Sequence, residues 1–238
     1  MSIPRGSPPG NTNSRRLLSL QNPNGAAAYG SNVFSDQGGN GTYNGMLLSL
    51  QHRLVHHYTA LANYTWSHCI SEVAFTGDLA GSQYQIPGTR GANRGDCNFD
   101  YRHVANLSLV LQSAGIGDGW LRRFSKDWQL APIVQVRSGG PLTVTTGSDT
   151  SLTGVGQDRP NIVNPSLAVP ANQSAAAWLY RGAFANNAPG TYGNAGRDAF
   201  RGPHYVNVDF SLSRMFTIHE GWQLEVRGES FNALNHAN

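Results

Sequence analysis

The stretch VNVDFSLSRMF, residues 206–216, alternates apolar and polar side chains almost without interruption. One face of this extended segment would carry Val206, Val208, Phe210 and Leu212. The other face would carry Asn207, Asp209, Ser211 and Ser213. A period of two residues predicts a β-strand with two unlike faces. The function depends on what covers the apolar face, because a soluble sandwich packs it against a second sheet and an outer-membrane barrel packs it against lipid.

The same alternation recurs in five more segments of similar length. They are residues 42–54, 58–68, 101–112, 127–139 and 222–234. In the segment 58–68, for example, the apolar positions are Tyr58, Ala60, Ala62, Tyr64 and Trp66. The sequence therefore predicts six long strands. Pro132 weakens the fourth of them, because proline cannot donate a ladder hydrogen bond.

The connections between these strands are unequal in an ordered way. Residues 55–57 and 217–221 are short links, and a moderate link with the sequence GIGDGW joins the third strand to the fourth. The segments 69–100 and 140–203 are long and rich in Gly, Asn, Asp, Thr and Pro. Because consecutive antiparallel strands alternate in direction, all short links fall on one side of the sheet and all long ones on the other. Short periplasmic turns and long extracellular loops are typical of outer-membrane barrels.

Strand length and the placement of aromatic residues also favour lipid over a soluble core. A bilayer is crossed by roughly nine to eleven tilted residues, whereas sandwich strands more often have about five or six. The aromatic residues gather at strand ends, which matches the two interfacial girdles of a membrane barrel. They are Tyr58, Trp66, Tyr101, Trp128, Tyr205, Phe216 and Trp222. The expected fold is all-β, an antiparallel up-and-down transmembrane β-barrel.

Composition limits the possible partners and locations. Charged residues make up 13% of the chain, the formal net charge is +3, and the basic residues are scattered, which argues against nucleic acid as a partner. The sequence contains no apolar run of eighteen residues, so it predicts no transmembrane helix. The start MSIPRGSPPGN does not resemble a signal peptide. Either the protein stays in the cytoplasm, or the sequence lacks its true beginning.

Cys69 and Cys97 favour the second interpretation. They bracket a polar, glycine-rich segment, as a loop-closing disulfide does in an oxidising compartment. By the chain-entropy estimate, closing a loop of this length contributes about 3 kcal/mol to stability. The alternative is a pair of unrelated free thiols. No Cys or His spacing near them supports a zinc site.

Six strands are too few to close a barrel. Each unpaired backbone group in hydrocarbon costs several kcal/mol, and the smallest barrels have about eight strands. The chain also stops at ESFNALNHAN, just after a strand. We therefore expect a barrel fragment, with residues 1–41 as an irregular extracellular lead-in and residues 42–238 as the partial barrel.

Several runs carry a family resemblance in their order and spacing. They are NYTWSHCISE (63–72), NRGDCNFDYRH (93–103), RSGGPLTVTTGSD (137–149), QDRPNIV (157–163), GTYGNAGRDAFRGPHYVNVDFSLSRMF (190–216) and ESFNALNH (229–236). These runs resemble the carboxyl-terminal barrel region of TonB-dependent outer-membrane receptors of the Oar-like type, from residue 15 onward. The resemblance implies a place in the cell outer membrane and energy-coupled uptake of a small ligand.

In that family a barrel of about twenty-two strands surrounds an amino-terminal plug. An inner-membrane TonB complex pulls on a short TonB box to drive uptake. This sequence departs from the pattern, because it lacks a signal peptide, TonB box, plug, most of the barrel and the closing strand. The resemblance therefore implies three partners for the full-length protein: membrane lipid, its own plug and the TonB complex.

The resemblance also assigns roles to individual segments. The two long connections would be external loops that help to capture ligand, the first of them closed by Cys69 and Cys97. A short helix over residues 174–184, capped by Ser174, would pack Trp178 over the second loop, and a coil is the alternative. Several polar residues would face the lumen, where they contact plug or substrate or pair with one another across strands. They are Asn207, Asp209, Glu225, Arg227 and Glu229.

The sequence offers no credible catalytic, cofactor or metal site. His52, His56 and His57 in HRLVHH lack the glutamate of a zinc protease motif and lie where a strand ends. Residues 145–158 lack the acidic spacing of a calcium loop, and GIGDG lacks the lysine of a phosphate-binding loop. We therefore do not expect an enzyme. The rival hypothesis is a soluble secreted β-sandwich or adhesin-like binding module, whose apolar faces meet in a dry core.

Overall fold

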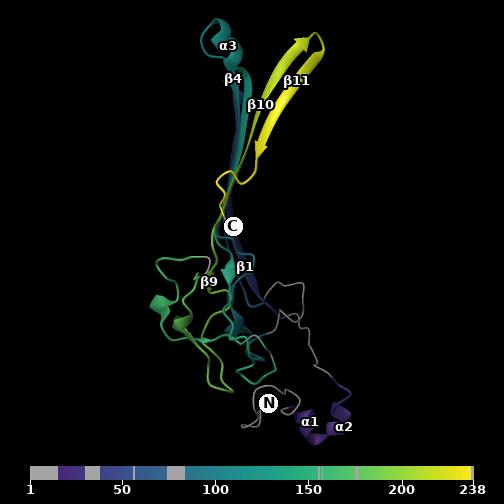
Figure 1. Cartoon of the computed structure of the whole chain (residues 1–238). Coiled ribbons are helices and arrows are strands. Elements are labelled where there is room, and N and C mark those ends of the chain that lie inside the picture. Colours follow the sequence, from purple (N-terminus) through teal and green to yellow (C-terminus); the bar gives the residue numbers. More distant parts are fainter. Residues whose placement is uncertain are drawn as a thin grey trace. The chain divides into compact units, whose positions relative to one another are not determined.

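A computed structural model describes residues 16–29, 38–55, 57–73, 84–154, 156, 158–174 and 177–236 (Figure 1). The chain divides into two compact units. The sheet unit comprises Asn44–His68, Tyr101–Gly139 and Pro203–Asn238. The loop unit comprises Met1–Tyr43, Cys69–Asp100 and Gly140–Gly202.

Six long strands follow one another across a single sheet in the order β1-β2-β4-β5-β10-β11. Their bounds are Gly41–Val55 (β1), Tyr58–Ser71 (β2), His103–Ala114 (β4), Lys126–Arg137 (β5), Tyr205–His219 (β10) and Trp222–Ser230 (β11). The pairings of β2 with β4, β4 with β5, β5 with β10 and β10 with β11 are antiparallel. The predicted all-β, antiparallel, up-and-down architecture is confirmed, and Pro132 lies inside β5 opposite Phe210.

The strand register aligns like side chains in rows across the sheet. Because side chains on paired strands at the same level point to the same side, one level places four apolar residues on one face. They are Ala62, Leu107, Val134 and Val208. The adjacent level places four polar residues on the other face, namely Asn63, Asn106, Gln135 and Asn207. The sheet therefore has one apolar face and one polar face.

The residues that the structure describes place no protein core against the apolar face. Among the described residues, all the buried apolar side chains lie in the loop unit: Ala26, Cys69, Cys97, Ala168, Ala183, Ala195 and Phe200. On the sheet, Leu107 is 40% exposed and Leu212 is 41% exposed. Where Ala62 and Ala105 lie between leucines, this face is hollowed by about 370 Å³. The described chain thus supplies no second layer for the sheet.

The short connections lie together at one end of the sheet unit, which we call the turn end. The turn at His57 joins β1 to β2, and the turn at Glu220 and Gly221 joins β10 to β11. The moderate link between β4 and β5 contains a helix, α3 (Gly119–Ser125), which Figure 1 labels beside the end of β4. None of the helices in the described residues has the length and apolar character to span a membrane.

The loop unit consists of short elements. Its helices are α1 (Leu17–Gln21), α2 (Pro23–Ala26), η3 (Arg90–Asn93), η4 (Pro165–Leu167) and η5 (Arg181–Ala183). Its short strands are β3 (Gly95–Asp96), β6 (Pro141–Leu142), β7 (Asn161–Ile162), β8 (Phe184–Ala185) and β9 (Phe200–Arg201). β3 extends the pairing of β2 beyond the predicted end of that strand, and β6–β9 and β7–β8 form two small ladders. The described parts of the two long connections therefore contain regular elements.

Two expectations for the loop unit need correction. The lead-in over residues 1–41 is not irregular throughout, because Asn22 caps α2 by accepting a hydrogen bond from the Gly25 amide, with Pro23 in the first turn. Of the two alternatives for residues 174–184, the helix is not formed in the described part of the segment, which favours the coil. Ser174 instead forms a bridge with Ala177, and only Arg181–Ala183 is helical, as a 3₁₀ turn. Residues 1–15, 30–37 and 175–176 of these two segments lie outside the described residues, and so does His56 of the HRLVHH run.

A small apolar core stabilises the loop unit. It is built from Ala168, Ala183 and Phe200, with Val144, Ile162, Leu179 and Phe184 packed around them. The rings of Phe184 and Phe200 meet edge to face at 5.4 Å between centroids. Nearby, Gly193 approaches another backbone segment so closely that a Cβ atom would lie 2.0 Å from the Arg159 carbonyl oxygen. Only glycine fits there.

This close approach predicts that Gly193→Ala destabilises the loop unit by about 1–3 kcal/mol, because two backbone segments must separate to admit the methyl group. Gly91→Ala is the matched control, since a Cβ there meets nothing within 4 Å. The measurement is the urea dependence of proteolytic cleavage within residues 140–202. Equal cleavage midpoints for the two variants would contradict the backbone approach.

Candidate functional site

The polar face of the sheet is the first candidate, and Asp209 is anchored within it. The Asn207 amide nitrogen donates to Oδ2 of Asp209 at 2.8 Å, and the Asn232 backbone N–H donates to its Oδ1 at 2.8 Å. The Ala233 N–H donates to the Val208 carbonyl oxygen at 2.7 Å. Asp209 therefore fixes the segment that follows β11, a role that the sequence pattern did not indicate.

The charged residues of β11 satisfy one another along the strand. Arg227 donates from Nη2 to Oε1 of Glu225 at 2.7 Å, and its Nη1 lies 3.7 Å from Oε1 of Glu229. These three residues share one face because they are two positions apart. Their partners in register on β10 are Met215, Ser213 and Ser211, so the ion pairs form along β11 and not across strands. This row carries two carboxylates and one guanidinium.

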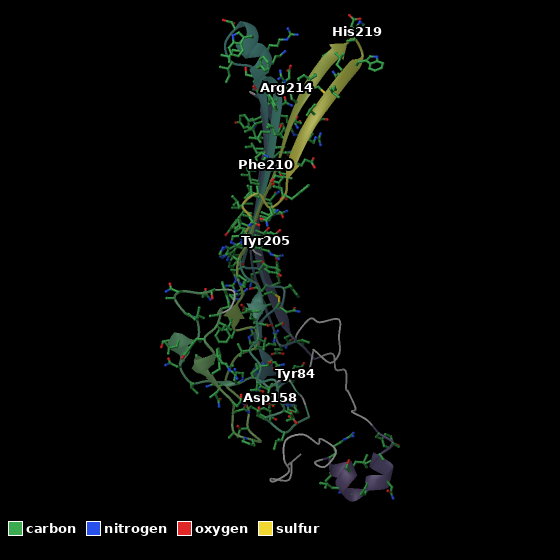
Figure 2. All side chains as sticks on the ribbon, viewed as in Figure 1. Tyr84, Asp158, Tyr205, Phe210, Arg214 and His219 are labelled. Carbon is green, nitrogen blue, oxygen red and sulfur yellow. A yellow bond between two sulfur atoms is a disulfide. The ribbon has the colours of Figure 1, made fainter. Side chains whose placement is uncertain are left out.

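Arginines stack on aromatic rings at both ends of the sheet unit. Near the start of β10, the guanidinium of Arg137 lies 4.6 Å from the ring centroid of Tyr101 and 4.7 Å from that of Tyr205. Toward the turn end, Arg214 lies 5.4 Å from Trp128 and 4.7 Å from Phe216. Figure 2 shows Tyr205, Phe210, Arg214 and His219 in succession along β10. Of the three histidines considered above, His52 stacks on Tyr58 at 4.2 Å between centroids.

The disulfide that closes the first long connection is formed. Cys69 and Cys97 are bonded, with their Cα atoms 5.3 Å apart, and they close a loop with a sequence separation of 28. The Cys97 N–H donates to the Cys69 carbonyl oxygen at 3.0 Å. The Cys69 N–H donates to Oδ1 of Asp100 at 2.7 Å. Backbone pairing and a buried carboxylate thus hold both half-cystines in place.

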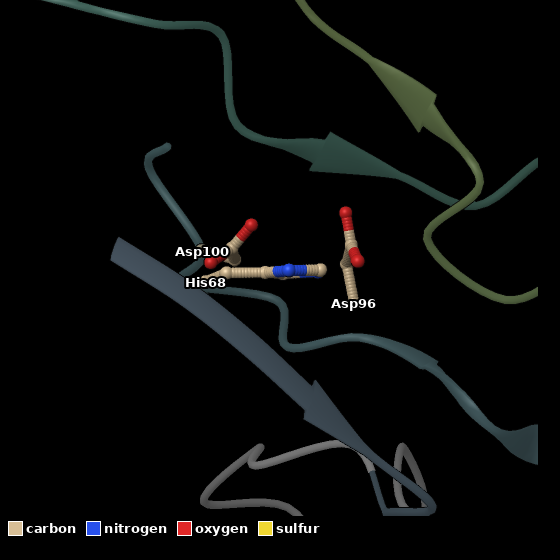
Figure 3. Close-up of side chains that lie close together, drawn as sticks. All are labelled: His68, Asp96 and Asp100. Atoms are coloured by element: carbon tan, nitrogen blue, oxygen red, sulfur yellow. The ribbon is translucent and has the colours of Figure 1, made fainter. Parts of the chain in front are cut away.

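A guanidinium links two carboxylates beside this disulfide. Nη2 of Arg201 donates to Oδ2 of Asp100 at 2.6 Å and also to Oδ2 of Asp96. Figure 3 shows the side chains of Asp96 and Asp100, and Asp100 is almost fully buried. Two carboxylates in this arrangement offer oxygen ligands to a hard cation. Arg201 supplies the neutralising positive charge between them, so the pair fits a structural ion-pair cluster.

Arg197 ties the two long loops together. Its Nε donates to the Asn93 carbonyl oxygen at 2.8 Å, its Nη2 to the Ser71 carbonyl oxygen at 2.6 Å, and its Nη1 to Oδ2 of Asp198 at 2.7 Å. Arg197 is only 6% exposed. Burial lowers the pKa of Arg197, and the adjacent Asp198 carboxylate opposes that shift. A buried guanidinium with this many partners acts as a cross-link between the loops.

Arg159 makes a second connection of the same kind. It donates from Nη1 to Oδ1 of Asn93 at 3.0 Å and from Nη2 to the Ala92 carbonyl oxygen at 2.9 Å. Burial lowers the pKa of Arg159, and the neighbouring Arg197 guanidinium lowers it further. The two arginines thus meet at Asn93, whose side chain and backbone accept from different guanidinium groups. Sequence reasoning missed this network, because isolated Arg and Asn residues carry no periodic signal.

The loop unit also contains a pocket of about 420 Å³. Its apolar wall includes Val144, Leu179 and Phe184, which belong to the small core. Thr146, Asn186 and the exposed Arg181 supply polar groups at the same pocket. An apolar wall with a few convergent polar groups is the usual composition of a small-molecule site.

The comparison with protein families gives the decisive observation. A family model described as an outer membrane beta barrel domain matches residues 3–238. The chain belongs to this outer membrane beta barrel family. Its location is accordingly the outer membrane, as the unequal connections and alternating strands predict. No curated protein and no solved structure matches the chain significantly.

Membership of the outer membrane beta barrel family explains the long strands of the sheet unit. The long, alternating strands of the sheet unit are the family's characteristic element. The loop unit contributes the buried charges, and it is these charges that hold its long connections in a defined fold. We therefore treat the polar face and the loop-unit pocket as the candidate functional surfaces.

The network around Arg197 predicts that Arg197→Met destabilises the loop unit by about 3–5 kcal/mol, because Asp198 and several carbonyl groups lose a buried partner. Arg94→Met removes an arginine from an exposed position nearby and should change stability by less than about 0.5 kcal/mol. Hydrogen exchange of the amides of residues 158–163 and 193–201 measures the difference. Unchanged protection in Arg197→Met would show that the cross-link contributes little.

Proposed function

We propose that this chain forms the carboxyl-terminal part of the barrel of a TonB-dependent outer-membrane receptor that takes up a small ligand by energy-coupled transport. The family assignment supports an outer-membrane barrel protein. The finer proposal rests on the Oar-like runs, which extend from residue 63 to residue 236 in the order and spacing of those receptors. Within this proposal the protein acts by binding and translocation and not by catalysis.

The observation that carries the proposal is the uncovered apolar face of the six-stranded sheet. Rows such as Ala62, Leu107, Val134 and Val208 lie side by side without buried neighbours in the described chain. Surrounding these rows with acyl chains removes them from water, which stabilises by about 25 cal/mol per Å² of apolar area. We therefore assign lipid as the partner of the apolar face.

The polar face then lines a water-filled interior, where the plug of the full-length receptor would contact it. Asn207, Asp209 and the charged row of β11 are hydrogen-bonded or ion-paired within the chain, so this wall is preorganised before any partner binds. Exposed carboxylates of Glu225 and Glu229 still present acceptor oxygens. Such a wall suits contact with polar or cationic groups of the plug or ligand.

The loop unit would receive the ligand on the outer side. Its disulfide and buried arginines supply the rigidity that a binding surface needs, and its pocket combines an apolar wall with Arg181. The alternative of a soluble adhesin-like sandwich needs a second layer over the apolar face. The described residues supply no such layer, and their buried apolar side chains belong to the loop unit.

The lipid assignment predicts opposite effects for two neighbouring substitutions on β10. Leu212→Arg places a charge among acyl chains at mid-strand and should weaken membrane assembly by about 2–4 kcal/mol, whereas Ser211→Arg faces water and should be tolerated. The measurement is the fraction of each variant that folds into phosphatidylcholine vesicles as urea is diluted. Similar losses in both variants would argue against a lipid-facing row.

Energy coupling predicts how uptake responds to loss of the proton gradient. A host strain in which the encoding gene is deleted should lose uptake of one nutrient, identified by growth on single sources. Wild-type uptake of that nutrient should stop when a protonophore is added and should also be lost when TonB is deleted. Uptake that depends on this gene but continues with protonophore would identify a passive pore instead.

A further inference from the structure

The short helix α3 exposes an apolar surface at the turn end of the sheet. Trp120 and Leu121 both lie on the side of the helix that carries Phe124, since Phe124 is four positions from Trp120 and three from Leu121. Their side chains are 73%, 45% and 66% exposed, and the rings of Trp120 and Phe124 meet edge to face at 6.2 Å between centroids. A surface of three large apolar side chains on one helical turn marks an interaction site.

The helix is held firmly against the sheet. The indole nitrogen of Trp128 donates to the Phe124 carbonyl oxygen at 2.8 Å. The Ser125 hydroxyl donates to the Leu121 carbonyl oxygen at 2.8 Å and accepts from the Ile116 N–H at 2.8 Å. These contacts close the link between β4 and β5 into a defined structure. The apolar surface of α3 therefore has a fixed position at the end of β5.

Arg214 places a cation in the apolar face at the same level. In register it faces Trp128 on β5 and Val226 on β11, and its neighbours along the same face of β10 are Leu212 and Phe216. One of its Nη atoms donates to the Arg123 carbonyl oxygen at the end of α3. Its Nε is buried and has no hydrogen-bond partner. A guanidinium in an apolar surface is costly unless an anion or water accompanies it.

Two further cations of this region lie on the polar side of the sheet. Arg122 and Lys126 line a pocket together with Glu225 and Ser213, which belong to the polar face. Lys126 also lies 3.9 Å from the Asp127 carboxylate. In contrast, neither Arg123 nor Arg214 forms an ion pair with a carboxylate of the described residues. Two guanidinium groups at the turn end, of which that of Arg214 lies in the apolar face, therefore remain to attract an external anion.

We propose that the interfacial patch, formed by Trp120, Leu121, Phe124, Arg123 and Arg214, binds the headgroup of an anionic phospholipid. Arg123 and Arg214 contact the phosphate, while the three apolar side chains of α3 lie among the ends of the acyl chains. The patch continues the apolar face through Leu212 and Phe216, so a lipid surface covers it in one piece with the rest of the sheet. A helix with an apolar side and adjacent cations lies in the interface plane of a membrane.

Lipid is favoured over a protein partner by the level at which these residues occur. Trp128, Phe216 and Trp222 end the strands beside the patch, as aromatic residues do at the headgroup level of membrane proteins. A long arginine side chain at that level keeps its stem among apolar groups and its guanidinium near the phosphates. The inference depends on membrane insertion of the sheet and not on TonB coupling.

The test uses the full chain reconstituted in phosphatidylcholine vesicles that contain about a tenth phosphatidylglycerol. Tryptophan quenching is compared when either lipid carries bromine atoms on its acyl chains. Trp66→Phe and Trp178→Phe in all proteins leave Trp120, Trp128 and Trp222 as reporters at the turn end. Brominated phosphatidylglycerol should quench more than its share of the lipid, with a local enrichment of roughly fivefold for each guanidinium.

Arg123→Gln combined with Arg214→Gln should abolish this enrichment without changing quenching by brominated phosphatidylcholine. The control removes the same charge by Arg94→Gln with Arg90→Gln, both exposed in the loop unit, and should keep the enrichment. If the double variant fails to fold, Arg123→Gln alone should lose part of the enrichment and Arg214→Lys should retain most of it. High salt should weaken the preference in the wild type.

Three outcomes would overturn the inference. Equal enrichment of both lipids in the wild type would mean that α3 contacts membrane without selecting a headgroup. Equal loss in the patch variant and the control would mean a general charge effect. Absence of quenching by either lipid would mean that the turn end is covered by protein, and it would also contradict insertion of the sheet. Loss of energy-coupled uptake alone would leave the lipid result unchanged, so the two proposals fail separately.

Discussion

The structure depends on one constraint, which is that the described residues provide no protein layer to cover the apolar face of a long-stranded antiparallel sheet. The alternation of Val206, Val208 and their counterparts on the other strands separates the two faces, and the register keeps like with like across the sheet. In water such a face would be a template for aggregation. In an outer membrane, we propose that lipid replaces the missing layer while the strands pair with one another. The family assignment places the chain in the outer membrane.

The loop unit is stabilised mainly by hydrogen-bonded arginines and a disulfide, and only to a small extent by an apolar core. Its long connections contain many polar residues and little apolar volume, so the small core around Phe200 cannot hold them alone. Arg197, Arg159 and Arg201 take that role, since each guanidinium donates to several groups from separate parts of the chain. The Cys69–Cys97 disulfide adds a covalent link that closes the first long connection. Buried charges of this kind favour one arrangement of the loops over others, because a displaced guanidinium would lose all of its partners together.

The sequence predicted the sheet well because its signal is local. Six alternating segments correspond to β1, β2, β4, β5, β10 and β11, with differences of a few residues at their ends. β2 runs to Ser71 and not to residue 68, because β3 pairs with its last residues from across the disulfide-closed loop. The ion pairs of β11 run along the strand, which follows from residues two apart sharing a face, although a cross-strand arrangement was also expected. The local alternation of the sequence thus predicted which face of each strand is apolar, whereas the ends of the strands depend on pairing with distant residues.

The helices and the loop network were harder to predict, for physical reasons. α3 is short and follows a glycine-rich turn, so Trp120, Leu121 and Phe124 gave only one turn of helical spacing. The helix expected from Ser174 does not form in the described residues, and the indole nitrogen of Trp178 donates instead to the Arg201 carbonyl oxygen at 2.6 Å, a contact between distant segments. Arg197 joins Ser71, Asn93 and Asp198, which no short pattern connects. Contacts of this type follow from the three-dimensional fold and not from spacing along the chain.

The central claim is that the apolar rows of the sheet lie in lipid and the polar rows in water. Nitroxide labels placed singly at each position from 206 to 213 test it most directly, with collision rates measured against oxygen, which concentrates in lipid, and against a water-soluble nickel complex. The account predicts a period of two along β10, with even positions accessible to oxygen and odd positions accessible to nickel. Even positions that are shielded from both reagents would place the apolar rows against protein and contradict the account.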